Sequence, residues 1–557
     1  MLAAFASLYG VWLFAGPELV RNEGIYAAAA AEFESHSPAV ATIHQWATPE
    51  CFPLFPAVVD FLHRHAGVPM VTALRGLSIV MLFAGAVLVY LAASARRSCT
   101  AGWVAAAMYF SSILALDKSV VGAPATGNAF FLLAAQLLFF EFGFRRSDWT
   151  RAWMFASLLV TAGFFNGGFE VPVFFIFPMF FLRRPLSVSS KYRRAGFAFA
   201  VVIIVLAVLW WAKEYNAFPR RQPILDVWRE NAAETANLSG LLTFPFAFVF
   251  MLLPWSVIAW MPFCVALQSL DTTPIFSRYL RTLVFPNLAL LWLAPWLGRG
   301  AYFYVFAPLA ILTGEFYEIG VRRYGERLRR FFITTEIFLA AVPAVIAIGC
   351  CVSEELLDRF VPWLSIDQSL DFRSGSGFWI LTAVMFVSSL LLLGYVHFRR
   401  RSDPVWMILL SVTLALALVF NGLMMPYRSQ DHSKRKFGSD LKRVLPPAAL
   451  AGTIYTLGTA HLNGGLFYAG YPVCRLDSLD ELSRKDAPKD APERPVYLLC
   501  PEFPQSAEFS WENLLDPDYK YNGHSLALWK GTPRRPSRND AAVDAGGKEK
   551  QMESVKL

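Results

Sequence analysis

Acidic and aromatic side chains directly follow the first hydrophobic segment of the chain. The sequence there reads Asn22-Glu23-Gly24-Ile25-Tyr26, and the alanines after it predict a helix from Asn22 to Glu34. A spacing of three residues places Glu23 and Tyr26 on one face of that helix. A carboxylate held beside a membrane could act as a general base toward an acceptor hydroxyl or amine. The alternative for Glu23 is an acid in a first helical turn, stabilised by the helix dipole.

Three side chains of types that bind zinc lie within the segment 44–55. They are His44, Glu50 and Cys51. A complete metal site needs a further ligand, which the sequence does not identify. We therefore expect no metal and no other cofactor, with a divalent ion as the alternative.

Several cations occur in a second polar loop, 213–243, and in a short turn near residue 299. Guanidinium groups bind phosphate oxygens in a bidentate manner, so these side chains could hold a phosphate or pyrophosphate. The alternative is that they extend toward lipid headgroups. They are Lys213, Arg220, Arg221, Arg229 and Arg299.

The composition is that of a membrane protein with many spans. Of the 557 residues, 56% are hydrophobic and only 17% are charged, whereas soluble domains carry about 25% charged residues. The net charge of +8 comes from short basic clusters between hydrophobic segments. Such clusters set loop orientation and contact lipid headgroups, so we expect membrane lipids and no nucleic acid as partners.

The hydrophobic segments predict thirteen transmembrane helices, since about 20 apolar residues cross a bilayer. The first lacks a basic start and a small-residue cleavage site, so it is expected to be a retained helix. The predicted spans are 2–16, 72–95, 101–117, 126–144, 152–167, 169–182, 196–212, 244–268, 281–298, 302–319, 331–352, 377–398 and 405–425.

The basic clusters fall in alternate loops, which predicts the orientation of the spans. The positive-inside rule makes their side cytoplasmic. The loops 17–71 and 213–243 and the C-terminal part then share the outer face, as in a bacterial plasma-membrane protein. The basic residues are Arg96, Arg97, Arg145, Arg146, Arg151, Arg183, Arg184, Lys191, Arg193, Arg194, Arg278, Arg322, Arg323, Arg327, Arg329, Arg330, Arg399, Arg400 and Arg401.

The composition changes after residue 425. Residues 426–532 are polar, and short strands near 453–457, 471–474 and 496–500 with a short helix at 477–482 predict a small extracytoplasmic α/β domain. Residues 533–557 have few apolar side chains and are expected to be disordered. Cys474 and Cys500 could form a disulfide if this domain is outside the cytoplasm.

Several short motifs resemble those of one family of membrane enzymes. Asn22-Glu23-Gly24-Ile25-Tyr26-Ala27 is similar to a family pattern Asp-Glu-x-x-Tyr-Ala, and Glu32 matches a later acid of the same helix. Pro49-Glu50-Cys51-Phe52-Pro53-Leu54-Phe55 is similar to Phe-Glu-Lys-Pro-Pro-Leu-Phe. Arg75, Trp228-Arg229-Glu230-Asn231 and Leu253-Pro254-Trp255 match further positions.

With these motifs the sequence resembles GT-C membrane glycosyltransferases, in the branch of protein O-mannosyltransferases and the aminoarabinose transferases that modify lipid A. The resemblance implies an all-α transmembrane domain over residues 1–425 with a small outer α/β domain. It also implies transfer of a sugar from a polyprenyl-phosphate donor to a lipid, glycan or protein acceptor on the outer face.

The chain departs from the family pattern at three positions. The family's first-loop Asp is Asn22, which cannot take up a proton, and the family's Lys is Cys51. The second-loop acid falls near Ala123-Pro124, where Asp117 is the only carboxylate nearby. We expect Glu23 and Asp117 to act as catalytic carboxylates. The expected substrate-binding residues are Asn22, Tyr26, Glu50, Arg75, Lys118, Arg229 and Arg299.

Two other function classes fit the same topology. A catalytically inactive or divergent relative that binds lipid or serves as a scaffold would have the same spans and would tolerate Asn22 and Cys51. A transporter or flippase would require intramembrane charges or broken spans in two matching halves, and the sequence shows no such symmetry.

Overall fold

The computed structural model forms two compact units, Met1–Asp431 and His432–Leu557. It describes residues 9–10, 13, 18–20, 22–33, 40–182, 190–224, 229, 238–294, 297–351, 383–384, 386–391, 393–394, 405–419, 434–445, 453–457, 462–476, 478–479, 481–482, 495–501, 503–504, 509–515, 519–521 and 524–533. The predicted spans 2–16 and 377–398 lie largely outside these residues, and of the predicted helix 477–482 the described residues Glu481 and Leu482 are helical.

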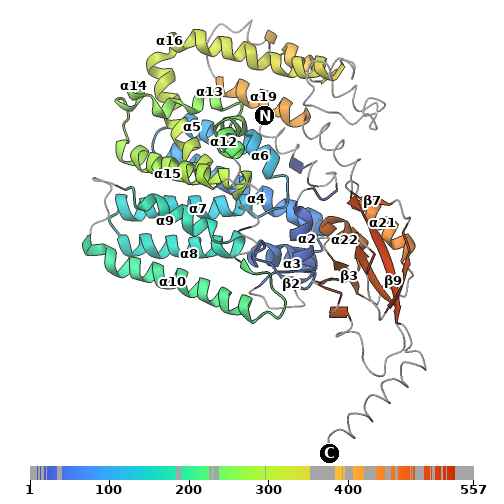
Figure 1. Ribbon diagram of the computed structural model, residues 1–557. Helices are drawn as coiled ribbons and strands as arrows, with labels where there is room; N and C mark the ends of the chain where they lie inside the picture. Colours follow the sequence, from blue (N-terminus) through green and yellow to red (C-terminus); the bar gives the residue numbers. More distant parts are fainter. Residues whose placement is uncertain are drawn as a thin grey trace, which may run out of the picture. The chain divides into compact units, whose positions relative to one another are not determined.

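The first unit is a helical bundle with a small hairpin near its start (Figure 1). Its elements are α2 (Glu23–Ala31), β1 (Thr42–Ile43), β2 (Trp46–Ala47), α3 (Leu54–Ala66), α4 (Met70–Ser94), α5 (Cys99–Ser111), α6 (Ile113–Lys118), α7 (Ala125–Phe139), the π-helix η2 (Phe140–Arg145), α8 (Trp149–Gly167), α9 (Glu170–Met179), α10 (Ser190–Ala217), α12 (Leu238–Met251), α13 (Ser256–Ala259), η3 (Met261–Phe263), α14 (Val265–Gln268), α15 (Pro274–Leu293), η5 (Arg299–Tyr302), α16 (Phe303–Cys351) and α19 (Val405–Val419).

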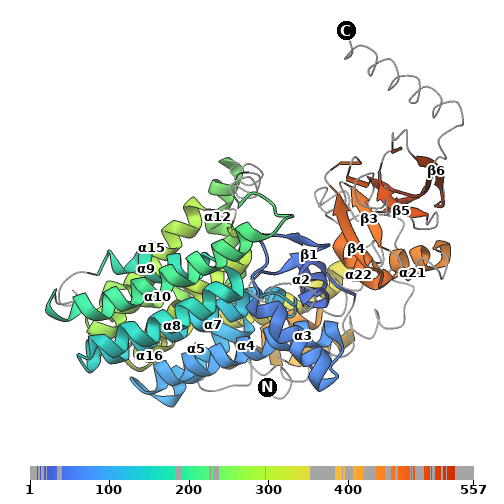
Figure 2. The ribbon, with the colours of Figure 1, turned by 90° about the horizontal axis from the view of Figure 1, so that it is seen from below.

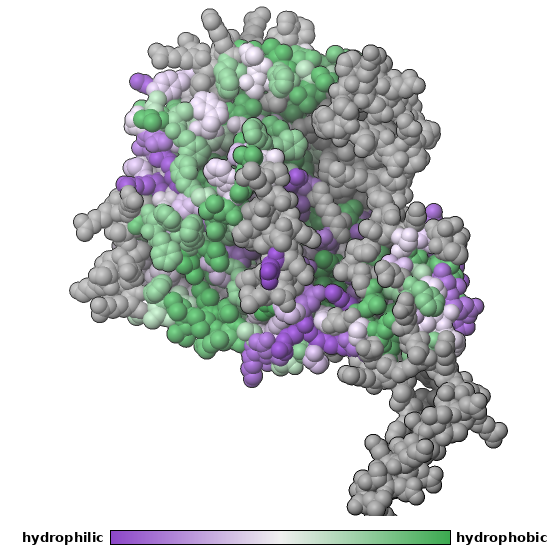
Figure 3. Space-filling model, in the orientation of Figure 1, coloured by the Kyte–Doolittle hydropathy of each residue, from purple (hydrophilic) through white to green (hydrophobic). Residues whose placement is uncertain are grey.

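Neighbouring helices of the bundle pack along their lengths. Helix α7 packs against α4 and α8, α8 also packs against α10, and α16 packs against α5 and α15; Figure 2 shows α7, α8 and α10 side by side. One large hydrophobic core joins these helices. Many large apolar side chains face outward, including Val80, Leu206 and Phe246 at 62%, 60% and 77% exposure. Figure 3 shows hydrophobic residues over much of the described surface on one side, as expected for helices that face lipid.

Within the described residues, three helical stretches are long and apolar enough to cross a membrane: Met70–Ser94, Ala125–Arg145 and Ala195–Ala217. A fourth candidate is the pair Gly240–Met251 and Ser256–Phe263, which is bent by 107°. The structure thus agrees with a membrane protein built of apolar helices, and the count of thirteen spans stays a prediction.

Two predicted boundaries differ from the structure. Residues 322–330, expected to form a basic loop, are helical, and α16 runs from Phe303 to Cys351 with one kink at Tyr324. Arg, Glu and Leu are good helix formers, so their charge did not end the helix. The predicted span 101–117 is broken at Ser112, whose backbone is extended.

The break between α8 and α9 depends on Gly168. Its φ of 89° lies in the range that favours glycine. A Cβ atom there would lie 2.4 Å from the ring of Phe52, which belongs to the first polar loop. The absence of a side chain therefore lets this loop pack closely on the bundle.

The second unit contains a five-stranded mixed sheet of order β4-β3-β5-β9-β6. Strands β3, β4 and β5 are parallel, and β9 is antiparallel to both β5 and β6. The elements are α21 (Lys434–Val444), β3 (Ile454–Leu457), α22 (Asn463–Ala469), β4 (Val473–Leu476), β5 (Val496–Cys500), β6 (Phe509–Asn513), β7 (Lys520–Tyr521), β8 (His524–Ser525) and β9 (Ala527–Pro533). The predicted disordered tail lies outside the described residues, apart from Pro533.

The order of the strands in the sheet excludes a disulfide between Cys474 and Cys500. Cys474 lies on β4 and Cys500 on β5, with β3 between these strands. Two strand spacings of about 4.8 Å each exceed the Cα separation of about 7 Å that a disulfide tolerates. Both residues are buried thiols.

Candidate functional site

Glu23 and Arg75 form a buried ion pair where α2 meets α4. Arg75 donates from Nε to Glu23 Oε1 at 2.9 Å and from Nη2 to Oε2 at 2.8 Å. The backbone N–H groups of Gly122 and Val20 donate to the same two oxygens, each at 2.7 Å. Both side chains are at most 2% exposed. Glu23 thus ties together α2, α4 and two loops.

This environment bears on the predicted role of Glu23 as a general base. Both carboxylate oxygens are occupied, and no water-accessible surface remains on the side chain. A base needs a lone pair within hydrogen-bond reach of the proton it removes. The geometry therefore favours a positioning role for Glu23 and Arg75, while the catalytic role stays a sequence-based prediction.

Glu32, at the end of α2, holds the β1–β2 hairpin. Its carboxylate accepts hydrogen bonds from the backbone N–H groups of His44 and Gln45 and from the hydroxyl of Thr42. His44 and Gln45 have φ of 54° and 65°, the left-handed geometry of a two-residue turn that usually contains glycine or asparagine. Burial raises the pKa of Glu32 to about 7, and these hydrogen bonds oppose the rise.

Tyr26 lies near two carboxylates. It is partly buried, and its ring meets that of Phe55 edge to face at 5.7 Å. Burial raises the pKa of its hydroxyl, and the nearby Cys51, Glu50 and Glu170 raise it further. Burial likewise raises the pKa of the Cys51 thiol, with Glu50 adding to the rise. Tyr26 is therefore a neutral hydrogen-bonding group next to negative charge.

Glu170 is the end of a directed series of hydrogen bonds, which we call the Glu170 network. Asn166 donates to Asn128 Oδ1 at 2.7 Å, Asn128 donates to the Tyr304 hydroxyl at 3.3 Å, and Tyr304 donates to Glu170 Oε2 at 2.5 Å. Each donor points toward the carboxylate, so the bonds polarise one another in the same direction. The four side chains come from α8, α7, α16 and α9.

Glycines make room for this network. A Cβ atom at Gly167 would overlap the Asn128 amide, at 1.9 Å from Nδ2, and Gly168 forms the turn between Asn166 and Glu170. Phe52, which covers this turn, also stacks on Trp211 with ring centroids 5.0 Å apart. The first polar loop and the ends of α8, α9 and α10 therefore meet at the network.

Asp117, Lys118 and Arg299 lie on two short elements that pack against each other. Asp117 is 5% exposed, and its Oδ2 lies 3.4 Å from Lys118 Nζ at the end of α6. Arg299 is exposed at the start of η5, which packs against α6 and α7. A Cβ atom at Gly300 would lie 3.1 Å from Ala125, one turn before Asn128. One carboxylate and two cations thus lie on adjacent elements near the start of α7.

The two predicted outer loops also meet. Ala47 donates to the carbonyl of Arg220 and accepts from the N–H of Gln222, so the hairpin continues into the second loop. Asn22 and Glu50 are exposed. Arg229 is exposed, and its neighbours in the Trp228–Asn231 motif lie outside the described residues.

Among the described residues, no group of three His, Cys, Asp or Glu side chains could hold a metal ion. His44 lies beside Glu32, its Nδ1 3.7 Å from Oε1, and does not join Glu50 and Cys51 in a ligand set.

The sequence analysis missed Asn128, Asn166, Glu170 and Tyr304. Glu170 and Asn166 flank the Gly167-Gly168 pair in an otherwise apolar stretch. A polar residue inside such a stretch is costly in a membrane and therefore indicates function. That signal was present for Glu170, but Tyr304 is 134 positions away and Asn128 lies on a different helix, so their proximity is visible only in three dimensions.

Comparison with known proteins gives a likeness at the level of the fold. No family model matches this sequence, and no curated protein sequence matches it. The crystal structure of ArnT from Cupriavidus metallidurans in the apo state is similar, with a TM-score of 0.65, 14% identity, and coverage of 95% of this chain and 96% of that chain. The structure of the same protein bound to undecaprenyl phosphate gives a TM-score of 0.61 at 13% identity, covering 95% and 97%. The chain therefore has the GT-C fold of ArnT, as its sequence resemblance predicts.

Proposed function

We propose that this protein is a membrane glycosyltransferase that moves a sugar from a polyprenyl-phosphate donor to an acceptor in the cell envelope. The observation that carries the proposal is the combination of the ArnT fold with the Glu170 network, which ends in a carboxylate near Tyr26. A solved ArnT structure contains undecaprenyl phosphate, which supports the class of donor. The acceptor is a lipid, glycan or protein of the outer face.

The proposed reaction is a substitution at the anomeric carbon of the donor sugar. The acceptor oxygen or nitrogen forms the new glycosidic bond, and the bond between the anomeric carbon and the phosphate oxygen breaks. The electron pair leaves with polyprenyl phosphate, and the acceptor proton passes to a protein carboxylate. No oxidant, reductant or metal is needed to balance this step.

We assign the proton acceptor to Glu170. Tyr304 donates to Oε2 and so orients the carboxylate, and within the described residues its other oxygen accepts no hydrogen bond. Asp117 is the second candidate, but it is nearly fully buried beside Lys118. General-base catalysis contributes about 10²–10⁴-fold to a rate. The two assignments therefore differ in which variant, of Glu170 or of Asp117, loses this factor in the transfer rate.

The cations are assigned to the departing phosphate. Arg299 is exposed, and it lies on the element that packs against α6, which carries Lys118. A positive charge there stabilises the negative charge that develops on the leaving oxygen. Glu23 and Arg75 join α2 to α4, and α2 carries Tyr26, whose hydroxyl lies near Glu170.

The test is a transfer assay in proteoliposomes with a series of radiolabelled polyprenyl-phosphate sugars. Release of polyprenyl phosphate together with label in an acceptor fraction would support the proposal. If the folded protein binds polyprenyl phosphate but transfers no sugar from any donor, the result would favour an inactive, lipid-binding relative. Such a protein would tolerate Asn22 and Cys51. Binding of no polyprenyl phosphate at all would contradict both readings.

A further inference from the structure

Trp211 of α10 packs against both sides of the turn that precedes Glu170. Its side chain is 1% exposed. Its ring meets the ring of Phe164, in the last turn of α8, edge to face at 6.0 Å, and the ring of Phe169, at the start of α9, edge to face at 5.8 Å. Between these two residues, the N–H of Gly168 donates to the carbonyl of Phe164 at 2.8 Å. Trp211 therefore contacts the residues on either side of the glycine turn.

Three stacked rings extend from this turn toward the outer loops; we call Phe52, Trp211 and Tyr215 the Trp211 stack. The Trp211 ring stacks on the Phe52 ring with centroids 5.0 Å apart and planes at 22°. It also stacks on the Tyr215 ring, at 5.0 Å and 28°. Phe52 in turn covers Gly168, where a Cβ atom would lie 2.4 Å from its ring. The stack thus contacts the glycine turn directly.

Tyr215 connects the stack to both outer loops. Its hydroxyl lies 2.6 Å from the carbonyl oxygen of Gln222 and 3.3 Å from that of Ala47. Ala47 ends strand β2 of the first loop, and its backbone is hydrogen-bonded to Arg220 and Gln222 of the second. Since protein interiors are close-packed, a shift of one buried ring displaces the rings in contact with it. The position of both loops therefore bears on the turn before Glu170.

We propose that Trp211 is a positioning residue for Glu170, which sets the orientation of this carboxylate relative to the two outer loops. Tyr304 holds one carboxylate oxygen, but the Gly167-Gly168 pair before α9 gives the backbone more freedom than other residues would. The rings packed around Trp211 restrict that freedom. The inference rests on the proposed role of Glu170 as proton acceptor. A reacting group that is displaced by about 1 Å can lose about 10²-fold in rate.

The first test compares Trp211→Leu with Trp210→Leu in the proteoliposome transfer assay. Trp210 is the matched control, because it lies on the same helix but is 47% exposed and packs against Phe165. Trp211→Leu should lower kcat by about 10–10²-fold with little change in binding of polyprenyl phosphate, and Trp210→Leu should transfer at the wild-type rate. Trp211→Phe keeps a ring in the stack and should restore most of the rate. A wild-type kcat in Trp211→Leu would overturn the inference.

A double variant shows whether Trp211 acts through Glu170. Added to Glu170→Gln, Trp211→Leu should cause little further loss of the residual rate, because the carboxylate that it positions is already absent. A further loss as large as the loss in the wild-type background would overturn the positioning role, since Trp211 would then act independently of Glu170.

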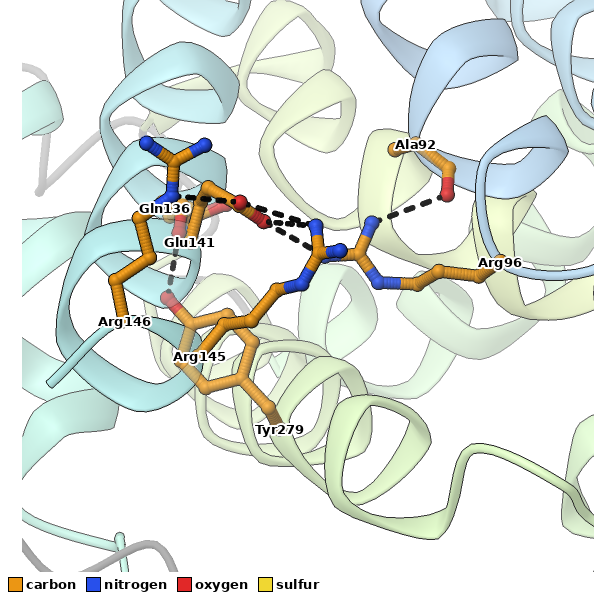
Figure 4. Close-up of polar contacts among 7 residues, drawn as sticks. All are labelled: Ala92, Arg96, Gln136, Glu141, Arg145, Arg146 and Tyr279. Carbon is orange, nitrogen blue, oxygen red and sulfur yellow. Dashed lines mark hydrogen bonds and ion pairs between the residues drawn. The ribbon is translucent and has the colours of Figure 1, made fainter.

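A milder variant keeps all buried rings in place. Tyr215→Phe removes only the hydroxyl that reaches both outer loops, so kcat should fall several-fold. Tyr279→Phe is its control, because the buried Tyr279 hydroxyl also donates to a backbone carbonyl, that of Gln136 at 2.9 Å, as Figure 4 shows. The Tyr279 ring packs against Phe140 and Phe144, outside the Trp211 stack, and this variant should transfer at the wild-type rate. Equal losses in the two variants would overturn the link between the stack and the loops.

A measurement that needs no turnover separates this inference from the proposed function. Glu170 is partly buried, and its labelling by a membrane-soluble carbodiimide can be followed by peptide mass spectrometry. Trp211→Leu should raise the labelling rate of Glu170 several-fold, and Trp210→Leu should not. If this difference appeared in a protein that transfers no sugar, the proposed reaction would fail while Trp211 would still position the Glu170 side chain. Equal labelling in the wild type and Trp211→Leu would overturn the inference.

Discussion

Arg75 reaches both carboxylate oxygens of Glu23, at 2.9 and 2.8 Å, across 52 positions of sequence. The pair is almost fully buried, and two backbone N–H groups complete the coordination of the carboxylate. The pair joins α2 to α4, and each of the two buried charges is compensated by the other.

The first prediction concerns the stability that depends on this pair. From the sequence, Glu23→Gln is expected to abolish transfer and leave expression intact. The buried pair predicts instead that Glu23→Gln lowers stability as well, because removal of one partner of a buried ion pair costs about 3–5 kcal/mol. Arg75→Met should do the same. Thermal unfolding of purified protein in detergent measures both.

Asp60→Asn is the control for this prediction. Asp60 pairs with Arg64 at 2.6 Å on the more exposed surface of α3, where ion pairs contribute about 0–1 kcal/mol. If Glu23→Gln were as stable as Asp60→Asn, a structural role for the Glu23–Arg75 pair would be untenable.

The second prediction compares two glycines with positive φ, Gly67 in the left-handed helical region with ψ of 16° and Gly168 outside it with ψ of −155°. Gly67 and Gly168 both have positive φ, but only Gly168 has a neighbour, Phe52, that an added Cβ would overlap. Gly67→Ala should cost about 1 kcal/mol from backbone conformation alone. Gly168→Ala should cost more, because its backbone lies in a region that is essentially confined to glycine and because Phe52 must move; it should also reduce transfer. Equal midpoints of thermal unfolding for the two variants would show that the contact with Phe52 is unimportant.

The sequence was informative where local pattern decides the structure. The helix after Asn22, the apolar helices and the strands near 454, 473 and 496 lie where the sequence places them. Residues 322–330 were predicted to form a loop, but they are helical apart from the kink at Tyr324, because basic residues indicate a membrane boundary without ending a helix. The Glu170 network was missed because hydrogen bonds between α7, α8, α9 and α16 leave no periodicity in the sequence.

The third prediction concerns pH and Glu32. Since burial raises its pKa to about 7 from an ordinary value of 4.5, the folded state binds this proton more tightly than the unfolded state. The contribution to stability is therefore largest at low pH and is lost as pH rises from the ordinary value toward about 7.

Thermal unfolding from about pH 5 to about pH 8 tests this, with the wild type compared with Glu32→Gln. As pH rises, the midpoint of thermal unfolding of the wild type should fall relative to that of Glu32→Gln, because glutamine does not ionise. A difference that is constant over this range would mean that Glu32 does not titrate there.

The fourth prediction concerns the two cysteines of the C-terminal unit. Because β3 separates their strands, Cys474 and Cys500 should both react with an alkylating reagent after denaturation without reductant. Peptide mass spectrometry with and without prior reduction measures this. A Cys474 or Cys500 peptide that is labelled only after reduction would contradict the sheet order.

The last prediction separates the candidate catalytic carboxylates. If Glu170 accepts the proton of the acceptor, Glu170→Gln should lower the transfer rate by about 10²–10⁴-fold with little change in binding of polyprenyl phosphate. Tyr304→Phe removes the hydrogen bond to Oε2 and leaves the carboxylate in place, so its loss should be smaller and should shift the pH dependence of the rate. Asn128→Ala should resemble Tyr304→Phe, because it acts on Glu170 only through Tyr304.

Glu214→Gln, a partly buried acid of α10 outside the Glu170 network, is the matched control and should transfer at the wild-type rate. If Asp117→Asn abolished transfer while Glu170→Gln retained it, the base would be Asp117, and the network would serve to hold α7, α8, α9 and α16 together.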